Sequence, residues 1–256
     1  ELGVTGVLSA PLISDTIKAP GAITLTVGGN IEAGCMIVGT NLPFIGSING
    51  PVRVESTNGD ILLGNYRNNL RYYADITGKG VTLEAPNGSI IIDYVTYITS
   101  KGGPLNLKAK NAIRVLKTGG YSGATFYTMD VTPVNIEAPV FEMNSGGAIA
   151  SSSAPMTITT DSATISATVR APYYTLWLRP LTPGRAFDLG RGTTPNTVAL
   201  NSIEVANMDA SGGTVRYGGP NAGRITVTAP ITRAGTARLW LDSPPTINPV
   251  SGNLAT

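Results

Sequence analysis

A short cassette recurs four times in the first half of the sequence, and it limits what the chain can fold into. Each copy is an alternating strand, a small residue, a turn built on Asn and a second short strand that opens with Ile. The copies cover residues 23–31, 52–61, 81–90 and 105–113. Their starting residues are 24 to 29 positions apart, a spacing typical of solenoid proteins built from stacked repeats.

The alternation gives each cassette two faces. Residues at every second position of a strand share a face, so each copy directs a pair of aliphatic side chains to one side. The pairs are Ile23/Leu25, Val52/Val54, Val81/Leu83 and Leu105/Leu107. Each turn holds an asparagine, which tolerates left-handed backbone and bonds locally through its side chain: Asn30, Asn58, Asn87 and Asn111. Segments 156–159, 176–179, 225–228 and 239–242 continue the alternation.

Two architectures could use such strands. In a β-sandwich, two-residue links join antiparallel partners, and Asn58-Gly59 and Asn87-Gly88 fit that pattern. In a parallel β-helix, the cassette recurs in one direction, so Val stacks on Val and Asn on Asn around an aliphatic column. Because like residues occupy like positions in every copy, we predict an all-β, right-handed parallel β-helix. It would have about ten to twelve coils and form a rod about 50 Å long.

We expect a single β-helical domain over residues 1–256, with two departures from the repeat. Residues 66–80 do not follow the cassette and are predicted to form an inserted loop. Residues 243–256 contain Ser-Pro-Pro-Thr and Asn-Pro and are predicted to form an extended tail. Gly or Pro interrupts almost every ten-residue window, and apolar residues recur at period two, so helices are not expected.

Composition excludes several classes of function. Charged residues make up 13% and hydrophobic residues 42% of the chain, whereas disordered chains combine high charge with low hydrophobicity. The net charge is +2 without a dense Lys/Arg cluster, so we expect no nucleic-acid partner. The chain has no His and one Cys, Cys35, which leaves no internal disulfide, and we expect no cofactor and no metal. No apolar run approaches the roughly 20 residues of a membrane-spanning helix.

The C-terminal third contains a distinctive order of motifs. They are Leu-Trp-Leu-Arg (176–179), Pro-Leu-Thr-Pro-Gly-Arg (180–185), Asp-Leu-Gly (188–190), Ala-Gly-Arg-Ile-Thr-Val (222–227) and a closing strand (236–241). In this order they resemble a module of large bacterial exoproteins of the filamentous-haemagglutinin-like class. The resemblance covers residues 173–247, and residues 20–120 share only the looser Ile-Thr-Leu repeat style of that class.

The resemblance implies a secreted or surface-displayed right-handed β-helix that serves as an adhesin stalk or an extracellular structural element. Proteins of this class are often exported by a partner outer-membrane transporter. We therefore expect a protein secreted to, or displayed on, the bacterial cell surface. The leading hypothesis is a surface fibre or adhesin-stalk segment without catalysis.

Tyrosine and arginine gather where the sequence departs from the cassette. Exposed Tyr and Arg are enriched at contact hot spots. This segment is therefore a candidate contact for a glycan or a host protein, through Tyr66, Arg67, Arg71, Tyr72 and Tyr73. A binding module of an adhesin is accordingly the second functional hypothesis. The structural alternative is that these tyrosines pack over an adjacent sheet.

Acidic residues are the place to look for chemistry, because polysaccharide-active enzymes of this fold need clustered carboxylates. Glu55 and Glu84 share a template position, and Lys108 takes that position in the next copy. We expect a solvated charge ladder on an outward sheet face and keep a polysaccharide-active enzyme as the third hypothesis.

Two further expectations concern the C-terminal module. Arg185 and Asp188 are close enough in sequence to form an ion pair that fixes the loop leaving the helix body. Trp177 and Trp240 lie between inward-facing aliphatic residues, so they should face outward. There they would cover a neighbouring element or mark a contact between subunits.

The ends of the helix bear on function, because the first and last coils of a β-helix expose unpaired backbone groups that pair with any strand they meet. Neither terminus has the pattern of an amphipathic capping helix. We therefore expect self-association end to end into a filament, or a place within a longer rod.

Overall fold

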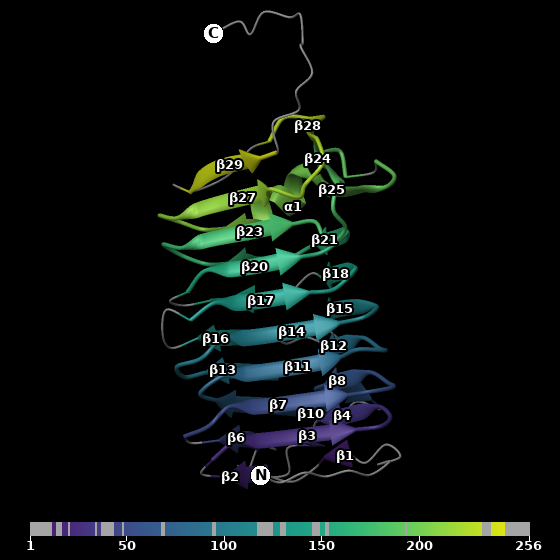
Figure 1. Ribbon diagram of the computed structural model, residues 1–256, viewed down its shortest axis with the longest axis vertical. Coiled ribbons are helices and arrows are strands. Elements are labelled where there is room, and N and C mark those ends of the chain that lie inside the picture. Colours follow the sequence, from purple (N-terminus) through teal and green to yellow (C-terminus); the bar gives the residue numbers. More distant parts are fainter. Residues whose placement is uncertain are drawn as a thin grey trace, which may run out of the picture.

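The computed structural model winds as a parallel β-helix (Figure 1). It describes residues 12–13, 17–19, 21–33, 35–36, 44–47, 49–67, 70–93, 96–116, 125–128, 132–144, 149–151, 154–192, 194–231 and 237–243. In Figure 1 the front strands run from left to right, the chain returns behind them, and it climbs toward the C-terminal end. The winding is therefore right-handed, and the predicted fold class is confirmed.

The front sheet contains nine parallel strands in sequence order, one from each successive coil. They are β3 (Ile23–Val27), β7 (Val52–Ser56), β11 (Val81–Ala85), β14 (Leu105–Ala109), β17 (Val134–Glu137), β20 (Met156–Thr159), β23 (Thr175–Arg179), β27 (Thr214–Gly218) and β29 (Arg238–Asp242). With the partial turn that precedes β3, this is close to the ten to twelve coils expected.

Two more faces complete each coil. The second sheet contains β1 (Leu12–Ile13), β4 (Ile31–Ala33), β8 (Ile61–Leu63), β12 (Ile90–Ile92), β15 (Ala112–Val115), β18 (Val140–Met143) and β21 (Ser162–Ile165). The third contains β2 (Ile17–Ala19), β6 (Phe44–Ser47), β10 (Leu70–Gly78), β13 (Thr96–Ser100) and β16 (Thr125–Thr128). Two three-stranded sheets follow: β19 (Ile149–Ala150), β22 (Val169–Arg170), β26 (Met208–Asp209), and β24 (Ala186–Gly190), β25 (Thr197–Asn201), β28 (Ile225–Val227).

The strand–turn–strand cassettes turn a corner of the helix and do not form hairpins. The turn at Asn58-Gly59 connects β7 to β8, which belong to different sheets, and each of these strands pairs in parallel with its counterpart in the next coil. The β-sandwich alternative is therefore wrong. Asn-Gly was compatible with both architectures because it marks a tight turn, whatever the direction of the strand that follows.

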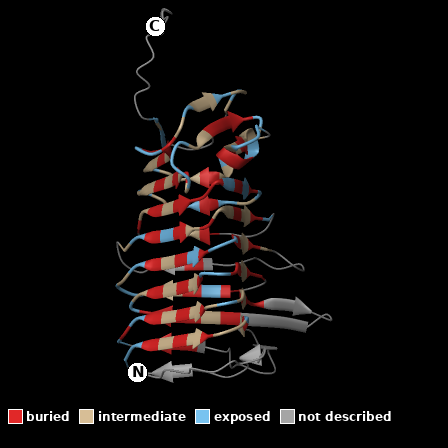
Figure 2. Ribbon diagram, turned by 45° about the vertical axis from the view of Figure 1, so that its right-hand side comes forward, coloured by how far each residue is buried: buried red, intermediate tan, exposed pale blue. Residues whose placement is uncertain are grey.

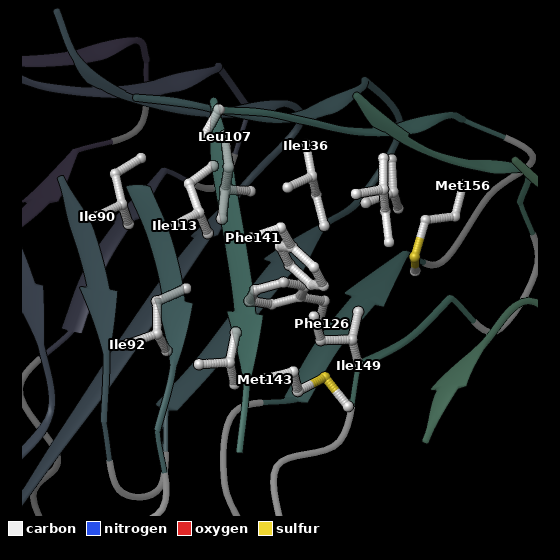
Figure 3. Packing of buried hydrophobic residues seen from close by; sticks show 14 of the residues in the cluster. Ile90, Ile92, Leu107, Ile113, Phe126, Ile136, Phe141, Met143, Ile149 and Met156 are labelled. Atoms are coloured by element: carbon white, nitrogen blue, oxygen red, sulfur yellow. The ribbon is translucent and has the colours of Figure 1, made fainter. Parts of the chain in front are cut away.

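The core is a set of aliphatic columns that run along the axis. In the front sheet Val81 lies beside Val52 on one side and Leu105 on the other, and all three side chains are buried. Figure 2 shows this alternation of buried and less buried residues along the front strands that precede β29. Figure 3 shows the columns meeting the buried rings of Phe126 and Phe141 from the other two sheets. Burying each such side chain contributes about 1.5–3 kcal/mol.

The turns of successive coils are bonded to one another. Asn30 Oδ1 accepts the amide of Asp60 at 2.9 Å, and Asp60 Oδ1 accepts the amide of Ser89 at 2.7 Å. Asn87 Nδ2 donates to the Thr57 carbonyl at 2.7 Å. The repeated Asn therefore does more than shape its own turn, because its side chain satisfies backbone groups of a neighbouring coil that the sheet ladders leave open.

The segment expected as an inserted loop, residues 66–80, contains the whole of a long strand, β10. The first part of β10 pairs antiparallel with β9 (Asn65–Arg67) and with β5 (Cys35–Met36). The second part, from Ala74 to Gly78, pairs in parallel with β13 and lies in the third sheet. The departure from the cassette thus forms an antiparallel extension of a strand that belongs to the helix body. Residues 244–256 of the expected tail lie outside the described residues.

One helix occurs among the described residues, and the sequence reasoning missed it. Helix α1 (Ser202–Asn207) is capped by Asn201, and Glu204 completes a reciprocal capping box. Asn207 Nδ2 and a Glu204 carboxylate oxygen bond the backbone of Ile165 in β21. Asn-x-x-Glu was the available signal, since a capping residue followed three positions later by Glu marks a helix start.

Asp161 organises the turn after β23. Its buried carboxylate accepts the amides of Leu181 and Thr182, at 3.1 Å and 2.8 Å, and the Thr182 hydroxyl. Arg185 lies 3.6 Å from the same carboxylate, so the expected pairing of Arg185 with Asp188 is wrong. Asp188 lies at a buried position of β24, and its carboxylate accepts hydrogen bonds from the hydroxyl groups of Thr194 and Thr228.

Candidate functional site on the front sheet

The outer face of the front sheet carries a column of charged side chains. The strand register places Glu84 beside Glu55 on one side and beside Lys108 on the other. Lys108 in turn lies beside Glu137. We call these four residues the charged column. The expected stacking of Glu55, Glu84 and Lys108 on one outward face is confirmed.

Each acid of the charged column has a basic partner. Arg53, from the adjacent outward position, donates to Glu55 at 3.1 Å and pairs with Glu84. Lys108 Nζ lies 2.8 Å from Glu137 Oε1, and the hydrogen bond and charge of Glu137 raise the pKa of Lys108. Lys108 is therefore a cation throughout the physiological range. This arrangement balances charge within the sheet, and exposed pairs of this kind contribute about 0–1 kcal/mol each.

Two shallow hollows lie beside the charged column. The larger, of about 390 Å³, is lined by Glu84, Lys108, Lys110, Glu137 and a rim of Pro86, Ala109, Pro139 and Leu181. The smaller, of about 210 Å³, shares Glu137 and Leu181 and adds Arg179 and Asn221 among its lining. Both open beside acids that are already ion-paired. They offer hydrogen-bonding groups to a polar ligand but no unpaired pair of carboxylates.

A second column of outward-facing residues runs next to the charged column, and at the C-terminal coils it ends in an aromatic stack. The guanidinium of Arg216 lies 4.1 Å from the ring centroid of Trp177 and 4.8 Å from that of Trp240. Arg216 also pairs with Asp242, with Nε 3.0 Å from Oδ2. Trp177 Nε1 donates to the Gly218 carbonyl at 2.6 Å. We call Trp177, Arg216 and Trp240 the Trp–Arg stack.

The expected outward orientation of both tryptophans is confirmed by this stack, and their surroundings differ. Trp177 is half-buried beneath Arg216, whereas Trp240 is 54% exposed. Sequence reasoning had not included Arg216, although its signal was present. Arg216 occupies the same template position as the two tryptophans, since Trp177 lies beside Arg216 and Arg216 beside Trp240 in the sheet.

The last strand of the front sheet leaves inward-facing side chains exposed. Leu239 and Leu241 of β29 continue the columns of Val215 and Tyr217. Val215 and Tyr217 are fully buried, but Leu239 is 44% and Leu241 42% exposed. We call β29, with these two leucines and the side on which no described strand pairs with it, the open edge. Apolar side chains on an unpaired strand favour contact with another strand.

The first strand of the front sheet presents the opposite situation. The inward-facing residues of β3, Ile23, Leu25 and Val27, are all buried, although β3 is the end of the described sheet. Within the described part of the chain, the two end strands of the front sheet are therefore unlike: the inward-facing residues of β3 are buried, and those of β29 are exposed.

The Tyr/Arg segment lies away from these features, on β9 and on the first part of β10. The backbone register places Tyr66 beside Arg71, and it places Tyr72 and Tyr73 beside Met36 and Cys35. The side chains of Tyr66, Arg67, Arg71, Tyr72 and Tyr73 lie outside the part of the chain that the structure describes. Their role as a contact stays a prediction.

The described residues contain no group of three or more Cys, Asp or Glu side chains arranged to hold a metal ion. Within the same part of the chain, no helix has the length and apolar character needed to cross a membrane.

Comparison with family models, with curated proteins and with solved structures gave no match to this chain.

Proposed function

We propose that this chain is a structural segment, an extracellular β-helical rod of the surface-fibre or adhesin-stalk kind, that associates end to end through its C-terminal coil. The observation that carries the proposal is the exposure of Leu239 and Leu241, at 44% and 42%, where the equivalent side chains one coil earlier are fully buried. Burial of apolar area stabilises association by roughly 25 cal/mol per Å² before the cost of ordering.

Two features support a structural role over catalysis. The acids of the charged column are neutralised by Arg53 and Lys108 within the sheet, which is the arrangement of a stable surface. The resemblance of residues 173–247 to extracellular bacterial β-helices supports the setting at a cell surface. In this role the columns of stacked side chains supply stiffness along the axis, and the end coil supplies the joint.

Sedimentation velocity over a range of protein concentrations, together with negative-stain imaging, tests the proposal. We expect species larger than one chain whose fraction rises with concentration, and rods longer than a single helix. The double variant Leu239→Lys/Leu241→Lys should remain a single chain because it places two charges on the open edge. Ile203→Lys, at an exposed position of α1, is the matched control and should associate like the unmodified chain. A strictly monomeric species at high concentration would overturn the proposal.

A further inference from the structure

The structure of the open edge indicates which end of a second copy would pair with it. A second copy could approach β29 with its N-terminal end or with its C-terminal end, but the inward-facing residues of β3 are already buried. We propose that two copies join tail to tail, with β29 of one antiparallel to β29 of the other about a two-fold axis at Trp240. This inference rests on the proposed end-to-end association and specifies its geometry.

The hydrogen-bonding groups of β29 fit this register. The Arg238 amide donates to the Gly213 carbonyl, and the Asp242 carbonyl accepts the Gly219 amide. In a parallel ladder alternate residues bond to the same neighbour, so residues 238, 240 and 242 face β27. The amides and carbonyls of Leu239 and Leu241 therefore point to the open side. Centred on Trp240, Leu239 of one copy lies opposite Leu241 of the other, and each such pair exchanges two hydrogen bonds.

The side chains of β29 are self-complementary in the same register. The strand reads Arg-Leu-Trp-Leu-Asp, so a two-fold axis at Trp240 places Arg238 of each copy opposite Asp242 of the other. The leucines of both copies then meet on the inward side and close the core across the joint. Opposite charges directly across a strand pair stabilise it, and like charges destabilise it. A shift of the register by two residues would lose both ion pairs.

The outward-facing side chains of β29 are also compatible with this pairing. Trp240 of the two copies would lie at the axis, in the pair without hydrogen bonds, where side chains of opposed strands are closest. Each Trp240 is supported from its own chain by Arg216 at 4.8 Å. The Trp–Arg stack of each rod thus ends on the exposed Trp240, and the joint brings the two stacks together.

Complementary charge reversal distinguishes this joint from any other end contact. Arg238→Glu places an acid opposite Asp242 of the second copy at two symmetric positions, and Asp242→Lys places a base opposite Arg238 at two positions. Each variant alone should dimerise about tenfold or more weakly than the unmodified chain. An equimolar mixture of the two should form the heterodimer and recover the affinity, because every facing pair is again of opposite charge.

Two controls separate charge pairing from damage to the strand. Asp242→Asn removes the pairing with Arg216 without adding a like charge, and it should weaken association less than Asp242→Lys does. Lys79→Glu makes an equal change of charge at an exposed turn between β10 and β11, and it should leave association unchanged. Sedimentation equilibrium on each variant and on the mixture measures these affinities.

A cysteine at the axis reports the register directly. In a Cys35→Ser background, Trp240→Cys should give a disulfide-linked dimer on oxidation, and Arg238→Cys should not, because it faces residue 242 and not itself. Failure of the charge-reversal mixture to recover the affinity, in a chain that still associates, would overturn the tail-to-tail joint and leave end-to-end association standing. A chain that does not associate under any condition would overturn both.

Discussion

Arg216 is held by three side chains at once: its guanidinium lies between the rings of Trp177 and Trp240 and pairs with Asp242. We expect Arg216→Ala to lower the free energy of unfolding by about 1–2 kcal/mol, since two ring contacts and a half-buried ion pair are lost together. Arg216→Lys should recover part of this loss, because it keeps the charge but not the planar group that stacks on both rings. Urea unfolding followed by tryptophan fluorescence measures both variants, and an unchanged midpoint for Arg216→Ala would contradict the expectation.

Asp75 is a half-buried carboxylate on the third sheet, and its environment predicts a pH effect. Burial raises the pKa of Asp75, while a hydrogen bond from Thr77 at 3.0 Å and the charge of Lys101 lower that pKa in part. Because the folded-state pKa is raised, the contribution of Asp75 to stability is fully present below the unfolded pKa. It is lost as pH rises through the folded pKa.

The Asp75→Asn variant removes this pH dependence and keeps an acceptor for Thr77. Relative to the unmodified chain, it should therefore be more stable at pH 7 and about equally stable at pH 3. Solvent screening at this half-exposed site limits the difference to less than about 1 kcal/mol. Urea unfolding at the two pH values measures it. An equal effect of the substitution at both pH values would show that the ionisation of Asp75 is not its cause.

At the scale of the elements, the turns stack as tightly as the strands do. A Cβ at Gly88 would collide with the backbone of Gly59 in the turn of the preceding coil, whereas a Cβ at Gly29 meets nothing within 4 Å. We expect Gly88→Ala to destabilise the chain by about 2–4 kcal/mol, because two bonded turns must move apart. Gly29→Ala is the matched control in the equivalent turn two coils earlier and should change stability by less than about 1 kcal/mol. Thermal unfolding of the two variants tests this contrast. Equal losses of stability in both variants would contradict it.

The elements also show how far the sequence predicts this fold. The front sheet was predictable because its period of two and the recurrence of the cassette fix both the inward face and the register, as for Glu55, Glu84 and Lys108. Helix α1 was not predicted, because six residues are too few to show a period of 3.6, and only its cap was readable. Arg185 was assigned to Asp188 from nearness in sequence, but the coil brings the more distant Asp161 to it.

The sequence predicted which residues of the candidate site face outward better than it predicted their partners and their exposure. The outward orientation of Trp177 and Trp240 followed from alternation, but their common partner Arg216 required the alignment of three coils. The exposure of Leu239 and Leu241 depends on where the stacking ends and is not encoded in the strand itself. Alternation assigns them to the core, and only the structure shows that no described strand follows β29 in the front sheet.

On the scale of the whole molecule, each coil contacts mainly its neighbours, so the stability of the rod is a sum of local and nearest-neighbour terms. A coil with a neighbour on one side only should open most readily. The front sheet ends on β3 and β29, but the inward-facing residues of β3 are buried and those of β29 are exposed. Fraying should therefore start at one end of the rod, with β29 opening first and the middle coils last.

Amide hydrogen exchange tests both this order of opening and the proposed joint. In dilute solution the amides of the middle strands, such as β11 and β14, should be the most protected, and those of β29 the least. Within β29 the amide of Trp240 bonds to β27, while those of Leu239 and Leu241 point to the open side. As the protein concentration rises, the last two should gain protection far more than the amide of Trp240, because only they acquire a new acceptor. Equal gains along β29 would indicate a general stiffening of the end coil, and no gain would show that the open edge stays unpaired.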